Sequence, residues 1–463
     1  MSRKRHICMA LFFGFGLMRS TAMAQTNVMV LDTFIETHRI ENLSATWQTV
    51  TLANSYTAPV VVCTYVLPSA ASNEAHTRVR NVFGSSFDVR VQRFENSSAV
   101  TASDVHCLVV ETGAHTLADG RKIEARTVLS DATSGNAVGW GNTQTENVTT
   151  SLTSGFSSMA VFGQVMTFFD TDASVFWTNN CSNRSTPPTA AAFCVGKHIG
   201  MINGTRLDET LGYIVAEPGS GTVHGVSYIF ALGGNSIAGT GNNPPYSYTI
   251  SGNFETAIAT QAAENGGNGG WSVLYGADPL PNNSIQLATE EETVAGDMSR
   301  NHINEQVYYS VFSSTQSASF SANKTVAMAA DNPSIYVIPG NDVIYTLTLE
   351  NTGNGPADLD SIFLVDSVPN EMEFFNGDMD GAGPATGPIL FEPGTSGLTL
   401  STTDIGYSFS TTRPTSMADC VDSPASGYVD TVRHICFAPK GYARAVNLYP
   451  GNTASVSFRM RIP

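Results

Sequence analysis

The chain has 463 residues, enough for three or four domains, and only 14% of them are charged. Its formal net charge of −17 repels phosphate backbones, so the composition argues against nucleic-acid binding. Glycine is abundant, and together with many Ser, Thr and Asn residues it favours short strands joined by turns over long helices.

The first residues have the features of an export signal. A cationic start at residues 3–5 precedes an apolar run at residues 7–18 that is too short to span a bilayer. Ala22-Met23-Ala24 then offers a small-x-small cleavage pattern. No later run is apolar for long enough to cross a membrane. We therefore expect a signal peptide at residues 1–24 and a mature protein that is secreted or displayed on the extracellular surface, without a transmembrane segment.

One strand-like segment occurs three times in the chain. It reads VHCLVVETG from Val105, LGYIVAEPG from Leu211 and, more loosely, VYYSVF from Val307. β-Branched and aromatic residues closed by Glu-x-Gly are typical of a core strand followed by a turn. A period of about one hundred residues is too long for a solenoid and fits a small β-sandwich. The three predicted sandwich modules cover residues 25–130, 131–240 and, as a shorter copy, 241–316.

The first module contains segments with the alternation of half-buried strands and one continuous apolar run typical of a fully buried strand. Phe87, Val89 and Val91 fall on one face of such a strand. A hairpin turn at Asp119-Gly120 is placed at the end of this module. The predicted strands cover residues 47–52, 59–63, 77–82, 87–92 and 122–125.

The second and third modules follow the same order with different insertions. Ala160-Val161-Phe162 takes the place of Val60-Val61-Val62, and residues 179–193 form an inserted polar loop. Residues 233–245, rich in Gly, Asn and Pro, are expected to link the second module to the third. In the third module, strands are predicted at residues 271–275 and 284–287, followed by an exposed acidic rim at Glu290, Glu291 and Glu292.

Six cysteines follow the predicted leader. An even number in an oxidising compartment predicts disulfides. A zinc site is the alternative, but the Cys-x-x-Cys spacing typical of one does not occur. Pairing of neighbours keeps each bridge inside one domain. The expected bridges are Cys63 with Cys107, Cys181 with Cys194, and Cys420 with Cys436.

The last domain, residues 317–463, has a different pattern. A Pro339-Gly340-Asn341-Asp342 turn opens it, a strand with period-2 alternation covers residues 343–349, and an Asn351-Thr352-Gly353 turn follows. With the later Asp366-x-x-Pro369 element, these motifs resemble the conserved-repeat domain of many bacterial surface proteins. The resemblance implies an immunoglobulin-like sandwich without chemistry of its own, used as a spacer or stalk.

The repeated modules are similar to the H-type lectin domain. The matching segments are residues 47–52, 59–62, 78–82 and 87–91 of the first module. This resemblance implies an antiparallel β-sandwich that trimerises and binds galactose-type sugars. The expected fold class is thus all-β, with tandem antiparallel β-sandwich modules and a C-terminal immunoglobulin-like sandwich.

Two groups of residues are candidate binding sites. Sugar recognition needs an aromatic face beside planar polar groups, and Arg90, Arg93 and Phe94 are the nearest such group. The alternative is a solvated strand face, which every sandwich has. The second group imitates the first half of a calcium loop, but a glycine stands at the position of the usual bidentate Glu, so an acidic turn is the alternative. Its members are Asn376, Asp378 and Asp380.

The sequence favours a non-enzymatic function. His-Glu-x-x-His, phosphate-loop and dinucleotide fingerprints do not occur. We expect a secreted or cell-surface binding and adhesion protein whose partners are glycans or other cell-surface components. No cofactor is expected other than calcium, and homo-oligomerisation stays open. A purely structural stalk or matrix component is the alternative, and a polysaccharide hydrolase with a carboxylate pair is a further one.

Overall fold

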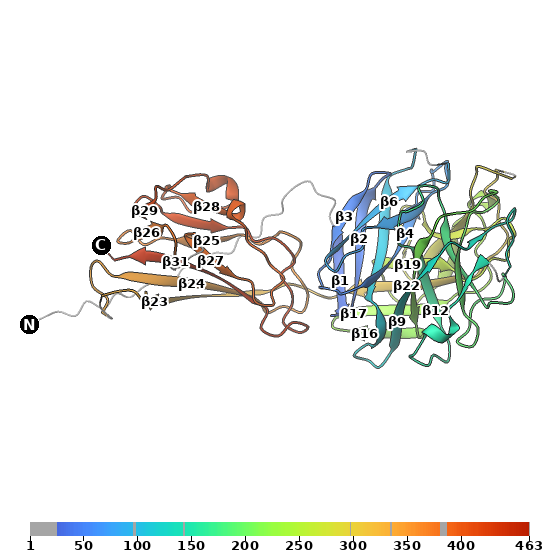
Figure 1. The fold of residues 1–463 in the computed structure, drawn as a ribbon, viewed down its shortest axis with the longest axis horizontal. Helices are drawn as coiled ribbons and strands as arrows, with labels where there is room; N and C mark the ends of the chain where they lie inside the picture. The colour runs from blue at the N-terminus through green and yellow to red at the C-terminus, as the bar shows by residue number, and fades with distance from the viewer. Residues whose placement is uncertain are drawn as a thin grey trace, which may run out of the picture. The chain divides into compact units, whose positions relative to one another are not determined.

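The computed structural model describes residues 26–95, 99–141, 144–296, 298–333, 336–379 and 387–462, so the predicted signal peptide lies outside these ranges. Strands form nearly all the regular structure, and the predicted all-β class is confirmed. The described ranges contain no helix with the length and hydropathy needed to span a bilayer. The chain divides into two compact units between Ala318 and Ser319, with Gly353–Pro356 belonging to the first (Figure 1). We call them the repeat unit and the C-terminal unit.

The repeat unit contains the same series of seven strands three times. The first copy comprises β1 (Thr26–Asp32), β2 (Ile35–Leu43), β3 (Gln48–Thr51), β4 (Pro59–Leu67), β5 (His76–Arg80), β6 (Ser86–Gln92) and β7 (Ser103–Glu111). The second comprises β8 (Gly113–Thr116), β9 (Lys122–Ser130), β11 (Glu146–Asn147), β12 (Ala160–Val165), β13 (Val175–Asn179), β14 (Cys194–His198) and β15 (Glu209–Ala216), with the additional β10 (Thr133–Ser134). The third comprises β16 (Gly219–Val223), β17 (Val226–Leu232), β18 (Tyr246–Thr249), β19 (Thr256–Gln261), β20 (Trp271–Tyr275), β21 (Ser284–Glu290) and β22 (Val307–Ser314).

Each copy arranges its strands in the same two sheets. The four-stranded antiparallel sheets have the orders β1-β2-β7-β4, β8-β9-β15-β12 and β16-β17-β22-β19. The smaller sheets have the orders β3-β6-β5, β11-β14-β13 and β18-β21-β20. The repeated segment of the sequence is therefore the seventh strand of each copy, at the same place between the second and fourth strands. Its matched register pairs are Cys107 with Cys63, Tyr213 with Gly163, and Tyr309 with Ala259.

The four-stranded sheets of all three copies contribute to one central core. This core includes Val62 and Leu108 from the first copy, Phe162 and Tyr213 from the second, and Phe230 and Phe312 from the third. On the opposite face of the first sheet, Val61, Cys107 and Val109 pack with Phe87, Val89 and Val91 of β6, which confirms the predicted common face of that strand. Because both faces of the sheet are covered, all nine residues of β4 are buried.

The copies begin earlier than the predicted module boundaries at 130 and 240. The hairpin around Asp119-Gly120, placed at the end of the first module, instead opens the second sheet, where β9 pairs with β15 from Ile123 to Ser130. The β16–β17 hairpin likewise opens the third. A hairpin has the same local pattern whichever sheet it joins, so its long-range partner cannot be read from its sequence.

The third copy is also joined directly to the first. β20 pairs in parallel with β4, through Leu274 with Val66 and Tyr275 with Leu67, so the two sheets merge into one of seven strands. The predicted linker at residues 233–245 lies inside this unit: Ile237 is fully buried, and its backbone pairs with Glu305. The three copies therefore form one compact unit and not separate domains joined by linkers.

The C-terminal unit is a sandwich of a six-stranded and a three-stranded antiparallel sheet. Its strands are β23 (Phe320–Met328), β24 (Asp342–Asn351), β25 (Leu364–Ser367), β26 (Glu373–Asn376), β27 (Ile389–Glu392), β28 (Ile405–Ser408), β29 (Gly427–Val429), β30 (His434–Phe437) and β31 (Thr453–Arg461). The larger sheet has the order β23-β24-β31-β26-β29, with β27 also paired to β31, and the smaller has the order β25-β30-β28. The predicted period-2 strand is β24, and its Val343 and Tyr345 enter the core with Phe458 and Ile435.

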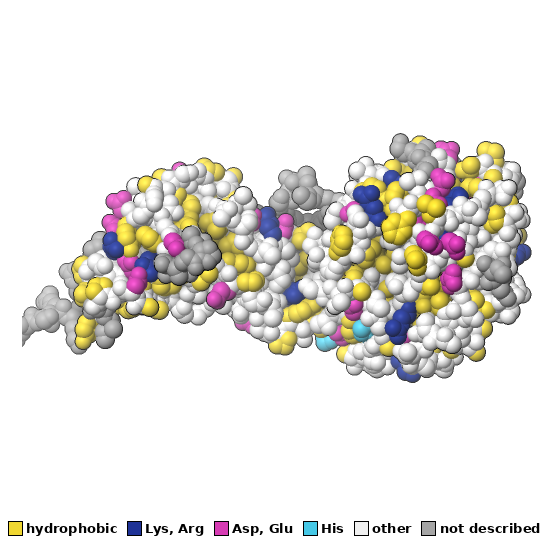
Figure 2. Space-filling view, in the orientation of Figure 1, with side chains coloured by type: hydrophobic (Ala, Val, Ile, Leu, Met, Phe, Trp, Pro, Cys, Tyr) yellow, Lys and Arg dark blue, Asp and Glu magenta, His cyan; other side chains and the backbone are white. Residues whose placement is uncertain are grey.

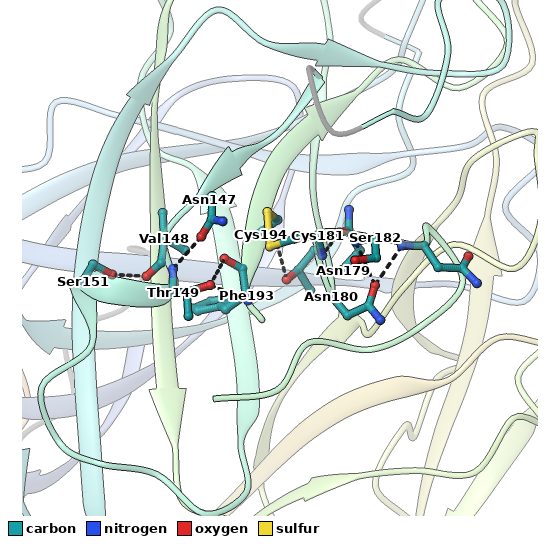
Figure 3. The surroundings of a disulfide bond; sticks show 12 residues. Asn147, Val148, Thr149, Ser151, Asn179, Asn180, Cys181, Ser182, Phe193 and Cys194 are labelled. Carbon is teal, nitrogen blue, oxygen red and sulfur yellow. Dashed lines mark hydrogen bonds between the residues drawn. A yellow bond between two sulfur atoms is a disulfide. The ribbon is translucent and has the colours of Figure 1, made fainter. Parts of the chain in front are cut away.

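All three predicted disulfides are present. Cys63 and Cys107 join directly opposite residues of β4 and β7. Cys181–Cys194 closes the inserted polar loop of the second copy (Figure 3), where the Cys181 N–H donates to Asn179 Oδ1 at 2.5 Å. Cys420–Cys436 anchors its loop to β30 of the C-terminal unit.

Candidate functional site

A cavity large enough for a small ligand lies between the first and second copies. It has a volume of about 580 Å³, within the range of small-ligand sites, and it opens between the end of β5 and the loop that follows β12. We call it the aromatic groove. Its lining includes Thr57, Arg80, Asn81, Phe83, Phe168 and Phe169.

Two phenylalanine rings of the aromatic groove face solvent. Phe83 is 60% exposed and Phe169 is 64% exposed. Figure 2 shows the visible face of the molecule as mostly uncharged, with scattered charged side chains. Contact between large apolar side chains and water is unfavourable, and a ligand that covers them removes this contact. This pair therefore marks a place for a ligand with an apolar face.

Planar polar groups lie beside these rings and are held in place. Asp88 accepts hydrogen bonds from Arg80 Nε at 3.2 Å and from Asn81 Nδ2 at 2.8 Å. Desolvation acts in the opposite direction, but these bonds and one from Thr49 hold the pKa of Asp88 below its ordinary value. Asp88 therefore stays ionised and fixes the guanidinium and the amide at the edge of the aromatic groove.

A stack of arginines and aromatic rings forms the wall behind the aromatic groove. The Trp47 ring lies 4.1 Å from the Arg80 guanidinium carbon and 4.7 Å from that of Arg90. Phe168 lies 4.8 Å from the guanidinium carbons of both Arg90 and Arg78. Such cation–π contacts stabilise the side chains they join and keep the wall rigid.

A buried ion pair positions the loop that carries Phe169. Glu209 accepts hydrogen bonds from the backbone N–H groups of Phe169 and Asp170 at 3.2 and 3.0 Å. Arg78 faces Glu209 at 3.3 Å and donates to the carbonyl oxygens of Asp170 and Asp172, both at 3.1 Å. Both charged side chains are fully buried, so the loop is tied to the second copy through β15 and to the first through β5.

The structure separates the three sugar-site candidates. Arg90 belongs to the wall of the aromatic groove. Arg93 is instead buried and ion-paired with Glu74 at 3.3 Å. Phe94 is only 6% exposed and stacks on Trp271 with ring centroids 5.2 Å apart. Phe94 therefore offers no exposed ring to a sugar.

Sequence reasoning missed Phe83 and Phe169. Phe83 comes three residues after the end of β5, and Phe169 follows Phe168 in a loop between buried strands. An aromatic residue in a loop outside any period-2 pattern is a weak signal of exposure. That the two loops meet depends on the pairing of copies, which local patterns do not contain.

The calcium candidate is only partly described. Asn376 ends β26, and its amide nitrogen donates to the carbonyl oxygens of Pro424 and Ala425 at 2.9 and 3.0 Å. Asp378 follows it, and Asp380 lies outside the described residues.

The predicted acidic rim is wrong, because all three glutamates are buried. Glu290 pairs with Arg300 at 2.6 Å, and Glu291 contacts His302. Glu292 accepts the backbone N–H of Val294 at 2.7 Å. Desolvation raises the pKa of Glu290 to about 7 despite its arginine partner. The sequence shows three consecutive acids, but the arginine and the histidine that pair with the first two come from the segment that follows.

His302 lies at the centre of a second buried cluster. Its Nδ1 contacts Glu291, and its Nε2 lies 2.8 Å from Glu305 Oε1. Desolvation alone lowers the pKa of His302, but the two hydrogen bonds and the Glu264 charge raise it to about 10. Desolvation and the charge of Glu305 raise the pKa of Glu264 well above its ordinary value.

The arrangement of this cluster favours a protonated His302 over a bound metal ion. Within the described ranges, the ligand atoms of Glu264, His302 and Glu305 lie within 4.8 Å of one another, close enough to consider a metal. A metal requires a lone pair from neutral histidine. Both ring nitrogens of His302 face carboxylates, which favours the doubly protonated imidazolium. We therefore interpret this cluster as a charge network that holds the loops of the third copy.

Comparison with curated proteins finds similarity to Halomucin from Haloquadratum walsbyi. Identity is 25% over 297 residues. The match covers 62% of this chain and 3% of the relative, so the chain spans a small fraction of that protein's length. No family model matches the chain, and no solved structure matches it.

Proposed function

We propose that this chain is a non-enzymatic binding protein, secreted or displayed at the cell surface, that binds a glycan in the aromatic groove. The observation that carries the proposal is the cavity of about 580 Å³ with exposed Phe83 and Phe169 beside Arg80 and Asn81. Sugars offer apolar C–H faces to aromatic rings and hydroxyl groups to planar donors and acceptors. The aromatic groove provides both kinds of partner within one cavity.

The fixed geometry of the aromatic groove supports this assignment. Its polar groups are anchored by Asp88, and its loop is anchored by the Arg78–Glu209 pair. A preorganised site loses less conformational entropy when it binds.

The arrangement of the copies supports the resemblance to H-type lectins. That family assembles trimers from separate chains, and here three related sandwiches share one core within a single chain. The single chain would thus supply the three-fold assembly that the lectins reach by trimerisation, with a binding site between neighbouring modules.

Two further observations support an extracellular location. The three disulfides fit an oxidising compartment. The similarity to part of the protein named Halomucin is in keeping with a cell-surface setting.

A glycan array probed with the exported chain tests the proposal. We expect binding to a restricted set of sugars, reduced about 2–13-fold by Phe169→Ala or Phe83→Ala, in line with about 0.5–1.5 kcal/mol for one stacking contact. Tyr336→Ala is the matched control, because this aromatic side chain is 70% exposed and belongs to the C-terminal unit. Binding that both groove variants leave unchanged would remove the aromatic groove as the site. An array without signal, with the protein still bound to cell envelopes, would favour the structural stalk.

A further inference from the structure

A buried lysine and aspartate bridge the two sheets of the C-terminal unit. Lys324 belongs to β23 in the larger sheet, and Asp366 belongs to β25 in the smaller one. Lys324 Nζ lies 2.7 Å from Asp366 Oδ1 and 2.8 Å from Oδ2. Their side chains are only 8% and 9% exposed. The amine therefore lies against the carboxyl group, close to both oxygens and shielded from water.

Aromatic rings enclose this pair. Lys324 Nζ lies 4.3 Å from the centre of the Tyr345 ring and 5.9 Å from that of Phe458, and the two rings stack. Arg413 is the other charged group near Asp366, and its guanidinium donates to the neighbouring Val365 carbonyl at 3.1 Å. Desolvation raises the pKa of Asp366 even though Lys324 and Arg413 act against it. Burial thus disfavours the ionised carboxylate of Asp366 in this position.

We propose that Lys324 and Asp366 form an intramolecular isopeptide bond that joins the two sheets covalently. Proton transfer within the hydrogen-bonded pair gives the neutral amine and acid. The Nζ lone pair then attacks Cγ, the new N–C bond forms, and one C–O bond breaks. Two of the three ammonium protons leave with the released oxygen as water, and the third stays on the amide nitrogen. The reaction is a dehydration without change of oxidation state, so it needs no cofactor or co-reactant.

The fold provides what this reaction lacks in solution. In water, an ammonium group and a carboxylate stay ionised and hydrated, and they meet only briefly. Here the strands hold the reacting groups in contact, which replaces a bimolecular encounter by a unimolecular step. Exclusion of water also protects the resulting amide from hydrolysis. The same chain contains a matched pair without these features, since Lys440 Nζ lies 3.8 Å from Asp360 and both side chains are nearly half exposed.

The mass of the folded full-length chain tests the bond. With disulfides reduced, we expect an intact mass lower than the sequence mass by one water, and a tryptic map in which the peptides of Lys324 and Asp366 are joined. The peptides of Lys440 and Asp360 should remain separate. Lys324→Arg keeps the positive charge and Asp366→Ala removes the acceptor, and each should restore the full sequence mass.

Two results would overturn the proposal. One is an unmodified mass with separate Lys324 and Asp366 peptides in protein that has been stored folded for days. The other is a loss of water that persists in Lys324→Arg, which would place the dehydration elsewhere. Mass is read on folded and unfolded chains alike, so neither result depends on the stability of a variant.

Discussion

Two buried charge clusters in the repeat unit hold loops in place with different cations. One joins the first and second copies, where Arg78 faces Glu209 beside the aromatic groove. The other lies in the third copy, where His302 is hydrogen-bonded to Glu291 and Glu305. Arginine remains charged in the unfolded chain across the neutral range, whereas histidine does not. The first cluster is therefore a fixed scaffold, and the second requires proton uptake on folding.

The largest expected effect comes from removing the arginine of the fixed cluster. Arg78→Met leaves Glu209 buried and unpaired, so we expect the free energy of unfolding to fall by about 3–5 kcal/mol. Urea denaturation of the full chain measures this loss. The double variant with Glu209→Leu should recover part of it, because it removes the orphaned charge. Additive losses would mean that the two side chains do not act as a pair.

The histidine cluster should show itself as a loss of stability at alkaline pH. The folded pKa of His302, about 10, lies above its ordinary value of 6.5, so its contribution is fully present below pH 6.5 and is lost as the pH rises toward 10. By linkage the loss is on the order of a few kcal/mol. The groups that face the ring are Glu264, Glu291, Glu305 and, through its electrostatic interaction, His198.

The substitution His302→Gln separates the contribution of His302 to the pH dependence of stability from that of neighbouring groups. It should flatten the dependence of unfolding free energy on pH between 6.5 and about 10. Glu290, with a folded pKa of about 7 and an ordinary value of 4.5, destabilises the fold in the same direction but in a lower pH window. That lower window should survive in the variant. An unchanged alkaline slope would show that His302 does not take up a proton on folding.

A smaller effect is expected from the disulfide of the inserted loop. This loop contacts the histidine cluster, since the Glu264 N–H donates to the Arg184 carbonyl at 2.8 Å. Replacing Cys181 and Cys194 by alanine opens a bridge with a sequence separation of 13 and should lower stability by about 2–3 kcal/mol. Glycan binding in the aromatic groove should be unaffected. Equal losses of binding and stability would show that the two regions are coupled.

The sequence predicts what is encoded locally. The alternation in residues 87–92 fixes the buried face of β6, and the continuous run from Pro59 fixes a strand covered on both sides. The recurrence of one strand-like segment predicts the three copies, because this strand has the same neighbours in the sheet of each copy. The order of the cysteines predicts which of them pair, because each bridge closes within one copy or unit.

The sequence does not predict features that depend on contacts between copies. Glu290, Glu291 and Glu292 look like a solvated surface. Arg300 and His302, from a segment that has no strand pattern, pair with Glu290 and Glu291, and backbone N–H groups donate to Glu292. The aromatic groove is missed for the same reason. Its two rings come from loops of different copies, and only the shared core brings them together.

The smallest expected effect on stability distinguishes the aromatic groove from the core beside it. Phe169→Ala removes a ring that is 64% exposed, so the free energy of unfolding should change by no more than about 0.5 kcal/mol, although glycan binding should weaken. Phe94→Ala is the matched contrast. That ring is buried against Trp271, and its loss should lower stability by about 3–5 kcal/mol. Thermal unfolding of the two variants measures the difference. A large loss for Phe169→Ala would mean that its ring supports the fold, since a residue kept for binding contributes little to stability until its ligand arrives.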